Sequence, residues 1–161
     1  MIKRELYMSQ IRPFMGSDLI KVITGIRRSG KSVMLELIKE ELMESGINPK
    51  QFISINFEDM IYFYLQTAYA LHEEILKRAS KINGKVYIFF DEIQEVKDWE
   101  KCINSLRVSL DCDIYITGSN AKLLSGELAT YLGGRYVEFV IYPFSFKEFI
   151  EIYHESVGKE S

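Results

Sequence analysis

Short apolar runs alternate along the chain with longer segments in which apolar residues recur every three or four positions. The runs are rich in β-branched and aromatic residues, as buried strands are. They predict five strands, at residues 19–24, 52–57, 86–92, 114–117 and 136–141. Because the segments between them have the spacing of amphipathic helices, we predict an α/β protein with a doubly wound parallel sheet and right-handed crossovers.

Local signals mark where several of the predicted helices begin and end. The helix after the first strand is expected to end at Gly46, and the next helix spans residues 65–82. Asp98 is expected to cap the helix that follows the third strand. Residues 145–148 have the spacing of a capping box, which predicts a last helix that runs through residue 152.

Length and composition indicate one globular domain. The chain has 161 residues, enough for a sizeable core, and 47% of them are hydrophobic. We expect residues 1–18 to form an amphipathic lead-in, 19–154 the α/β domain and 155–161 a frayed tail. The net charge of −3 comes from scattered acidic and basic residues, which do not indicate a nucleic-acid-binding surface.

The sequence has none of the long apolar stretches that a membrane span or a signal peptide requires. Its two cysteines, Cys102 and Cys112, lack the spacing of metal ligands, and each lies in or beside an apolar segment. Such cysteines are expected to be buried free thiols. Free thiols are typical of a reducing compartment, so we expect the protein to be cytoplasmic.

Residues 25–32 read GIRRSGKS and fit the phosphate-binding loop pattern G-x-x-x-x-G-K-[ST]. Glycines let such a loop turn its backbone N–H groups toward phosphate oxygens, and the next helix adds its N-terminal dipole. Lys31 supplies a positive charge for the β and γ phosphates, and the Ser32 hydroxyl can ligate Mg²⁺. The predicted nucleotide-binding residues are Gly25, Ile26, Arg27, Arg28, Ser29, Gly30, Lys31, Ser32 and Val33.

Two acids, Asp91 and Glu92, end the fully apolar third strand. A strand of this kind belongs at the centre of a parallel sheet, where ligands bind at the carboxyl ends of the strands. Asp91 is therefore expected to hold Mg²⁺, either through a water or at the Ser32 site, and Glu92 to polarise the attacking water as a general base. The alternative is that both acids cap a helix after a core strand.

Small polar residues end the fourth strand, in the sequence Thr117-Gly118-Ser119-Asn120. They either contact the γ-phosphate and the attacking water or cap the next helix. Arg135 follows two glycines just before the fifth strand. It is either an arginine finger that reaches a phosphate across a subunit boundary or a solvated turn residue.

An aromatic cluster, Tyr62, Phe63 and Tyr64, follows the second strand. In ring-shaped motors, aromatic residues in this region can line a substrate pore. Packing of a loop onto the core is the favoured interpretation here, because large apolar side chains are usually buried.

Four segments together resemble the ATPase domain of a large prokaryotic family within the AAA superfamily of P-loop ATPases. They read VITGIRRSGKS, YIFFDEIQEVKDWE, YITGSNAKLL and LGGRYVEFVIYPFSFKEFI, and the resemblance extends from about residue 21 to residue 152. It implies a three-layer sandwich with helices on both faces of a sheet of order 5-1-4-3-2, and ATP as the nucleotide. It also assigns Asp91 and Glu92 to the magnesium and water roles and Ser119 to a sensor position, while Arg135 matches the Gly-Arg turn of the family.

Members of this family usually join the ATPase domain to a C-terminal domain of poorly defined, possibly nuclease-like function, and AAA-type ATPases usually continue into a helical lid. The sequence ends shortly after the predicted helix near residue 149. We therefore expect a fragment of a longer protein or a truncated copy, without the lid and the C-terminal domain.

The expected function is that of an ATPase that hydrolyses ATP with Mg²⁺ to drive a conformational or assembly change. Glu92 and Lys31 would carry the chemistry with Ser119, and Arg135 would come from a neighbour in a homo-oligomer. The alternative is a nucleotide-gated interaction module that binds ATP with little or no hydrolysis. A GTPase would need an Asn-Lys-x-Asp segment, which the sequence does not contain.

Overall fold

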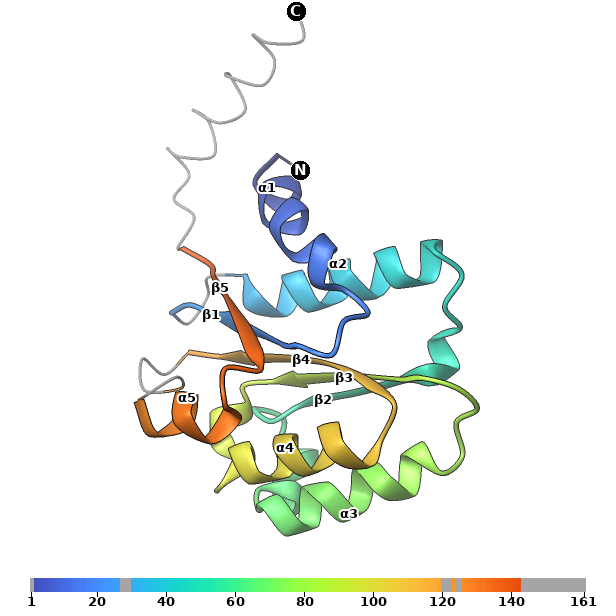
Figure 1. Ribbon diagram of the computed structural model, residues 1–161, viewed down its shortest axis with the longest axis vertical. Helices are drawn as coiled ribbons and strands as arrows, with labels where there is room; N and C mark the ends of the chain where they lie inside the picture. The colour runs from blue at the N-terminus through green and yellow to red at the C-terminus, as the bar shows by residue number, and fades with distance from the viewer. Residues whose placement is uncertain (1, 27–29, 120–122, 124–125, 143–161) are drawn as a thin grey trace, which may run out of the picture.

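Five parallel strands form the centre of the protein in the computed structural model, which describes residues 2–26, 30–119, 123 and 126–142. The strand order is β2-β3-β4-β1-β5, the predicted order 5-1-4-3-2 counted from the other edge. The predicted fold is therefore confirmed (Figure 1). The strands are β1 (Ile20–Thr24), β2 (Phe52–Asn56), β3 (Val86–Asp91), β4 (Cys112–Gly118) and β5 (Tyr136–Val140).

Helices cover both faces of this sheet. In Figure 1, α1 and α2 lie above the sheet, whereas α3 and α4 lie side by side below it. None of the described helices combines the length and the apolar character that crossing a bilayer requires. The helices are α1 (Ile2–Ile11), α2 (Lys31–Glu44), α3 (Ala68–Ala79), α4 (Trp99–Ser109) and α5 (Gly126–Leu132), with 3-10 turns η1 (Arg12–Phe14), η2 (Pro49–Gln51), η3 (Met60–Leu65) and η4 (Ile93–Glu95).

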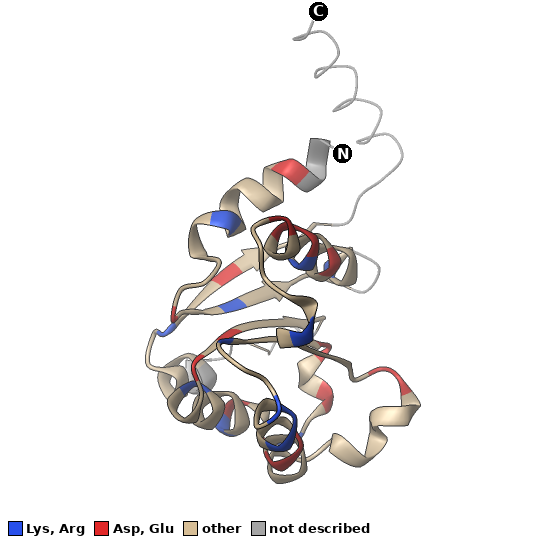
Figure 2. Ribbon diagram, turned by 90° about the vertical axis from the view of Figure 1, so that its right-hand side faces the viewer, with Lys and Arg blue, Asp and Glu red and all other residues tan. Residues whose placement is uncertain are grey.

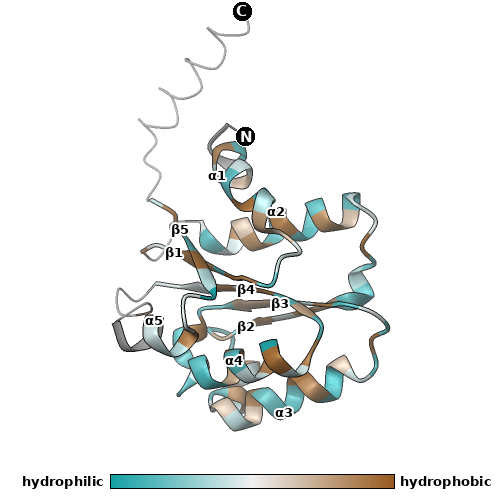
Figure 3. Cartoon of the chain, in the orientation of Figure 1, coloured by the Kyte–Doolittle hydropathy of each residue, from teal (hydrophilic) through white to brown (hydrophobic). Residues whose placement is uncertain are grey.

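The alternation of side chains along each strand divides the apolar residues into two cores. In β3, Val86, Ile88 and Phe90 pack toward α3 and α4, while Tyr87 and Phe89 pack toward α2. All of them are buried, so β3 is apolar on both faces, as a central parallel strand must be. Figure 3 shows the hydrophobic positions gathered on the strands and on the helix faces that meet them.

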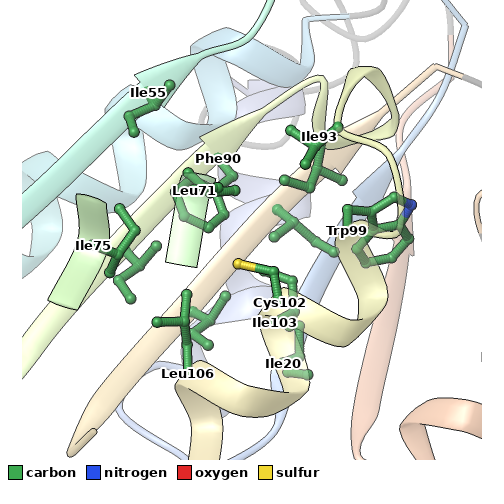
Figure 4. Packing of buried hydrophobic residues seen from close by; sticks show 14 of the residues in the cluster. Ile20, Ile55, Leu71, Ile75, Phe90, Ile93, Trp99, Cys102, Ile103 and Leu106 are labelled. Atoms are coloured by element: carbon green, nitrogen blue, oxygen red, sulfur yellow. The ribbon is translucent and has the colours of Figure 1, made fainter. Parts of the chain in front are cut away.

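The core below the sheet is the larger of the two, and in it side chains of the strands pack against α3 and α4. Figure 4 shows Leu71 and Ile75 of α3 and Ile103 and Leu106 of α4 converging on Phe90 of β3. The four aliphatic side chains are completely buried. Burying a side chain of this size contributes about 1.5–3 kcal/mol, so this layer holds the β3 end firmly in place.

The second core packs the N-terminal helix against the sheet and α2. Met8 and Ile11 of α1 are buried in it. Arg12 then forms ion pairs with Glu5 of α1 and with Glu41 of α2, so its side chain links the two helices at the surface. Figure 2 shows acidic and basic positions interspersed along the helices.

Two local features differ from the sequence-based predictions, and a third prediction is not tested. The helix expected over residues 65–82 begins only at Ala68, because η3 precedes it and Thr67 Oγ1 accepts a hydrogen bond from the N–H of Ala70 at 3.2 Å. Asp98 stands at the N-cap of α4 but has a left-handed backbone (φ 57°) and makes no capping bond. The helix predicted through residue 152 lies outside the described residues.

The aromatic cluster after β2 was predicted to pack onto the core, and this prediction is wrong for two of its three residues. Phe63 and Tyr64 are 62% and 60% exposed, and only Tyr62 packs against the core. The six-residue η3 turn explains the difference. Its three residues per turn direct successive side chains around the axis, so a run of aromatic residues cannot all face inward.

A buried ion pair joins β1 to β4 at the amino-terminal edge of the sheet. The side chains of Lys21 and Asp113 are both inaccessible to solvent, and their charged groups are in direct contact. Tyr115 donates its hydroxyl hydrogen to Asp113 Oδ2 at 2.6 Å, and the N–H of Gly16 donates to the same oxygen at 2.9 Å. Lys21 also donates to the carbonyl of Ser17 at 2.9 Å, so the pair fastens the N-terminal segment to the sheet.

Burial determines the protonation behaviour of several groups in these cores. It lowers the pKa of the Lys21 ammonium group, and the negative charge of Asp113 opposes that shift. It raises the pKa of the Tyr115 hydroxyl, with Asp113 acting in the same direction, so Tyr115 remains a hydrogen-bond donor. Both cysteines are free, Cys102 is buried, and burial raises its pKa to about 12.

The buried pair leads to a prediction about stability. Replacing Lys21 by Met should lower the free energy of unfolding by about 3 kcal/mol, because Asp113 would remain buried without its counter-charge. Urea unfolding followed by circular dichroism measures this change. The control is Arg78→Met, which removes a helix-surface ion pair with Glu74 and should cost less than about 1 kcal/mol. An equal decrease in the free energy of unfolding for the two variants would show that the buried pair stabilises the protein no more than the surface pair.

Candidate active site

The polar residues predicted to act together lie at the carboxyl-terminal edge of the sheet. Because β1, β3 and β4 are parallel neighbours, their carboxyl ends meet at this edge. Thr24 at the end of β1 is in register with Gly118 at the end of β4, and the last residue of β3 is Asp91. The loops that leave the three strands therefore face one another, as expected for the ligand side of an open α/β sheet.

The phosphate-loop segment leads from β1 into α2. Gly30 is the N-cap of α2 and has a left-handed backbone (φ 95°), which a glycine adopts without strain. Lys31 is the first residue of the helix, and its ammonium group donates to the carbonyls of Gly25 and Ile26, each at 2.9 Å. Ile26 and Val33 are exposed, and residues 27–29 lie outside the described residues.

Ser32 and Asp91 bring two oxygen atoms together beside this loop. Ser32 donates its hydroxyl hydrogen to Asp91 Oδ2 at 2.5 Å, and Thr117 of β4 donates to Asp91 Oδ1 at 2.5 Å. Hydroxyl and carboxylate oxygens are the ligands that Mg²⁺ prefers, and Mg²⁺ usually takes only one or two such ligands from the protein beside waters and phosphate oxygens. This pair fits that ligand set.

Glu92 follows directly and has an unusual backbone. Its φ of 58° lies in the left-handed region, where a non-glycine residue is strained. The N–H of Glu92 donates to Thr117 Oγ1 at 2.9 Å, so one threonine hydroxyl links both acids to β4. Glu92 stands at the N-cap of η4 without making a capping bond through its side chain, and the helix-capping alternative does not describe it.

The Glu92 carboxylate lies among hydrogen-bond donors. Its Oε2 accepts from the N–H of Ser119 at 3.2 Å, from the Ser119 hydroxyl at 2.8 Å, and from Gln94 Nε2 at 2.5 Å. Its Oε1 is 3.5 Å from Lys31 Nζ. Burial raises the pKa of Glu92, but the hydrogen bonds from Gln94 and Ser119 and the charge of Lys31 outweigh burial, and the pKa is lowered. The carboxylate is therefore ionised at neutral pH.

Burial makes this group of charges unusual. Lys31, Asp91 and Glu92 are only 4%, 7% and 6% exposed. Isolated charges in such a position would be costly, and here each is held by a partner of opposite charge or by several hydrogen-bond donors. The arrangement can neutralise a negatively charged ligand at Lys31 while it keeps an ionised carboxylate beside it.

The other two predicted site residues lie at opposite edges of the sheet. Ser119 directly follows β4 and contacts Glu92, whereas Asn120 lies outside the described residues. Arg135 immediately precedes β5 and is exposed at the amino-terminal edge, where its carbonyl accepts from the N–H of Ile20. A full strand length therefore separates Arg135 from the phosphate loop of its own chain.

Two functional contacts were not found from the sequence. Gln94 was not singled out, although it lies two residues after Glu92, and Thr117 was considered only as a neighbour of the nucleotide. A signal for Thr117 exists, because a hydroxyl at the end of a buried strand must find a hydrogen-bond partner. The sequence offers no comparable signal for Gln94, whose contact depends on the turn at Glu92.

Known proteins resemble this chain over most of its length. An uncharacterized protein of Haemophilus influenzae is 49% identical over 150 residues, which are 93% of this chain and 38% of that protein. An uncharacterized protein of Methanocaldococcus jannaschii is 42% identical over 143 residues, 87% of this chain and 30% of that protein. The chain thus spans about a third of the length of these relatives.

Comparison with solved structures and family models agrees with the fold. The structure of AMPPCP-bound DnaA from Aquifex aeolicus superimposes with a TM-score of 0.53 and 15% identity, over 96% of this chain and 49% of that chain. At this identity, the likeness shows the fold alone. Residues 17–150 match the model of the family described as the AAA domain. The chain belongs to this family, and so to the AAA superfamily of P-loop ATPases.

Proposed function

We propose that this domain binds ATP with Mg²⁺ and hydrolyses it to drive a conformational or assembly change. The observation that carries the proposal is the convergence of four side chains, Lys31, Ser32, Asp91 and Glu92, at the carboxyl ends of β1 and β3. Phosphoryl transfer needs a cation for the phosphates, oxygen ligands for a metal, and a group that orients water. The proposal is supported by family membership and by the nucleotide analogue bound to the DnaA neighbour.

Lys31 and the start of α2 bind the phosphates. The ammonium group is already held over the loop by the carbonyls of Gly25 and Ile26, so little of its freedom remains to be lost on binding. A phosphate placed there attracts the charge of Lys31 away from Glu92 and meets the positive end of the α2 dipole. In the nucleotide-free protein Lys31 balances the charge of Glu92, and on ATP binding the same ammonium group pairs with the phosphates instead.

Ser32 and Asp91 would hold Mg²⁺. When bound, the metal neutralises the charge that develops on the phosphate oxygens. Thr117 keeps Asp91 in place through its hydroxyl, and the same hydroxyl accepts from the backbone of Glu92. A single β4 residue thus contacts both the carboxylate of the proposed metal ligand and the backbone of the proposed general base.

Glu92 accepts a proton from the attacking water. Its ionised state at neutral pH provides the lone pair that a general base needs. Ser119 touches the carboxylate from the end of β4, which is a suitable position for a residue that senses the γ-phosphate.

Arg135 acts on a neighbouring subunit in this proposal. Its place at the amino-terminal edge keeps it from its own phosphate loop, and its exposure leaves it available to another chain. An arginine finger in trans requires a homo-oligomer, at least transiently.

We also propose that the part of the relatives that this chain does not cover holds a C-terminal domain driven by ATP hydrolysis. We propose further that the protein works in the cytoplasm.

A second candidate function is a nucleotide-gated interaction module with little or no hydrolysis. The observation that favours it is the occupied carboxylate of Glu92, whose Oε2 accepts three hydrogen bonds. Its Oε1 lies 3.5 Å from Lys31 Nζ, so as long as Lys31 stays there both oxygens are held and the carboxylate is a poor acceptor of a proton from water. If these contacts persist with ATP bound, nucleotide binding changes only the association of the domain.

The catalytic assignment predicts separate effects for two variants. Glu92→Gln should bind ATP normally and lose at least about a hundredfold in kcat, because the amide cannot act as a base. Lys31→Ala should weaken ATP binding by at least about tenfold. Steady-state turnover and titration with a fluorescent ATP analogue measure both effects. The control is Glu95→Gln, which changes an exposed acid three residues further on and should leave turnover unchanged. Normal turnover in Glu92→Gln would show that the catalytic assignment is wrong.

The arginine-finger proposal predicts a dependence on protein concentration. Turnover per chain should rise with concentration in the wild type, and Arg135→Ala should lower kcat by at least about a thousandfold without weakening ATP binding. Mixing Arg135→Ala with Glu92→Gln should restore part of the activity, since some interfaces then combine an intact arginine with an intact base. Arg78→Ala, on the surface of α3, is the control, and turnover independent of both concentration and Arg135 would contradict the proposal.

The two candidate functions differ in how long an assembly formed with ATP lasts. Light scattering with and without Mg-ATP should show a larger assembly with nucleotide in either case. The interaction module alone predicts that this assembly persists for hours, because ATP is not consumed. Disassembly in step with phosphate release would identify the ATPase, and an unchanged mass at all concentrations would exclude the module.

A further inference from the structure

The two oxygens of the Glu92 carboxylate have different surroundings. Oε2 accepts all three hydrogen bonds, two from Ser119 and one from Gln94. Among the residues that the structure describes, Oε1 has only the ammonium group of Lys31 nearby, at 3.5 Å. The carboxylate thus has one held oxygen and one that faces the lysine of the phosphate loop.

The hydrogen bond from Gln94 is the shortest of the three. The charge of the carboxylate determines which end of the Gln94 amide faces it. An ionised carboxylate only accepts hydrogen bonds, so the amide nitrogen of Gln94 must face it. This nitrogen also lies 3.4 Å from Ser119 Oγ, which closes a triangle of Glu92, Gln94 and Ser119. The left-handed backbone of Glu92 leads the chain into η4, from which Gln94 folds back onto the carboxylate.

The other end of the Gln94 amide is less well satisfied. Its Oε1 is buried and has no hydrogen-bond partner within the part of the chain that the structure describes. A Cβ at position 118 would come within 2.9 Å of this oxygen, so the close packing depends on Gly118. A buried acceptor without a partner costs free energy. The arrangement therefore favours the bond to Glu92 at the expense of the other end of the amide.

We propose that Gln94 is a positioning residue for Glu92. By holding Oε2, it turns Oε1 toward the phosphate side, where Oε1 can accept a proton from water once Lys31 has moved to the phosphates. The occupied oxygen then positions the base instead of blocking it. This inference rests on the proposed ATP hydrolysis, because Gln94 acts only through the orientation of Glu92.

The test compares Gln94→Met with the wild type. Methionine keeps the length of the side chain and removes the donor, so kcat should fall roughly tenfold while KM and the affinity for a fluorescent ATP analogue change less than about twofold. Gln94→Glu should lose at least as much, because a second carboxylate repels the first. Gln51→Met is the matched control, since Gln51 Nε2 donates to the carbonyl of Lys85 at the other edge of the sheet.

A double variant separates positioning from a general effect on the structure. If Gln94 acts through Glu92, adding Gln94→Met to Glu92→Gln should lower turnover no further. Thermal unfolding shows which of the two Gln94 variants is folded, and that one is used for the comparison. A kcat for Gln94→Met no lower than that for Gln51→Met would overturn the proposal, as would an additional loss in the double variant.

Crystal structures of the nucleotide-free wild type and Gln94→Met give a second readout that does not depend on turnover. The proposal requires the Glu92 carboxylate to leave the N–H of Ser119 or to adopt several orientations in the variant. An unchanged carboxylate would overturn the proposal. If the wild type shows no Lys31-dependent turnover, the proposed hydrolysis fails, and this comparison still decides whether Gln94 orients Glu92.

Discussion

The parallel pairing of β1 with β4, and of β4 with β3, fixes the positions of the polar groups at both edges of the sheet. At the amino-terminal edge it brings Lys21 against Asp113, a pair that holds the N-terminal segment. At the carboxyl-terminal edge it brings the phosphate loop beside Asp91 and the end of β4. Both edges carry buried charges, and a change in the register of these strands would leave several of them unpaired.

The two edges use their buried charges differently. Lys21 and Asp113 neutralise each other directly, and Tyr115, Gly16 and Ser17 add hydrogen bonds to the pair. At the other edge, Lys31 is shared between backbone carbonyls and Glu92 at the longer distance of 3.5 Å. Lys21 and Asp113 are therefore permanent partners within the folded chain. Lys31 can leave Glu92 for a negatively charged ligand, and a binding site requires such an exchange.

The short apolar runs predicted the strands of the sheet, whereas the strand order came from the resemblance to the family. The phosphate loop and the acidic pair are local patterns, and the structure places Ser32 beside Asp91 as expected. The sequence did not predict the contact of Gln94 or the exposure of Phe63, since both depend on how a 3-10 turn directs side chains. The two bonds from Ser119 to Glu92 are likewise a result of strand order and not of spacing along the chain. Local chemistry was thus readable from the sequence, whereas contacts between loops needed the fold.

The order of the strands has a consequence for how the domain is made. Both neighbours of β1 come from the second half of the chain, because β4 begins at Cys112 and β5 at Tyr136. During synthesis, β2 and β3 can pair early, while β1 must wait for about ninety further residues before its first partner emerges. Until then its apolar side chains and both backbone edges are open to other chains. Of the five strands, the one that carries the phosphate loop is translated first but paired only after β2 and β3, so its apolar surface is exposed for longest during synthesis.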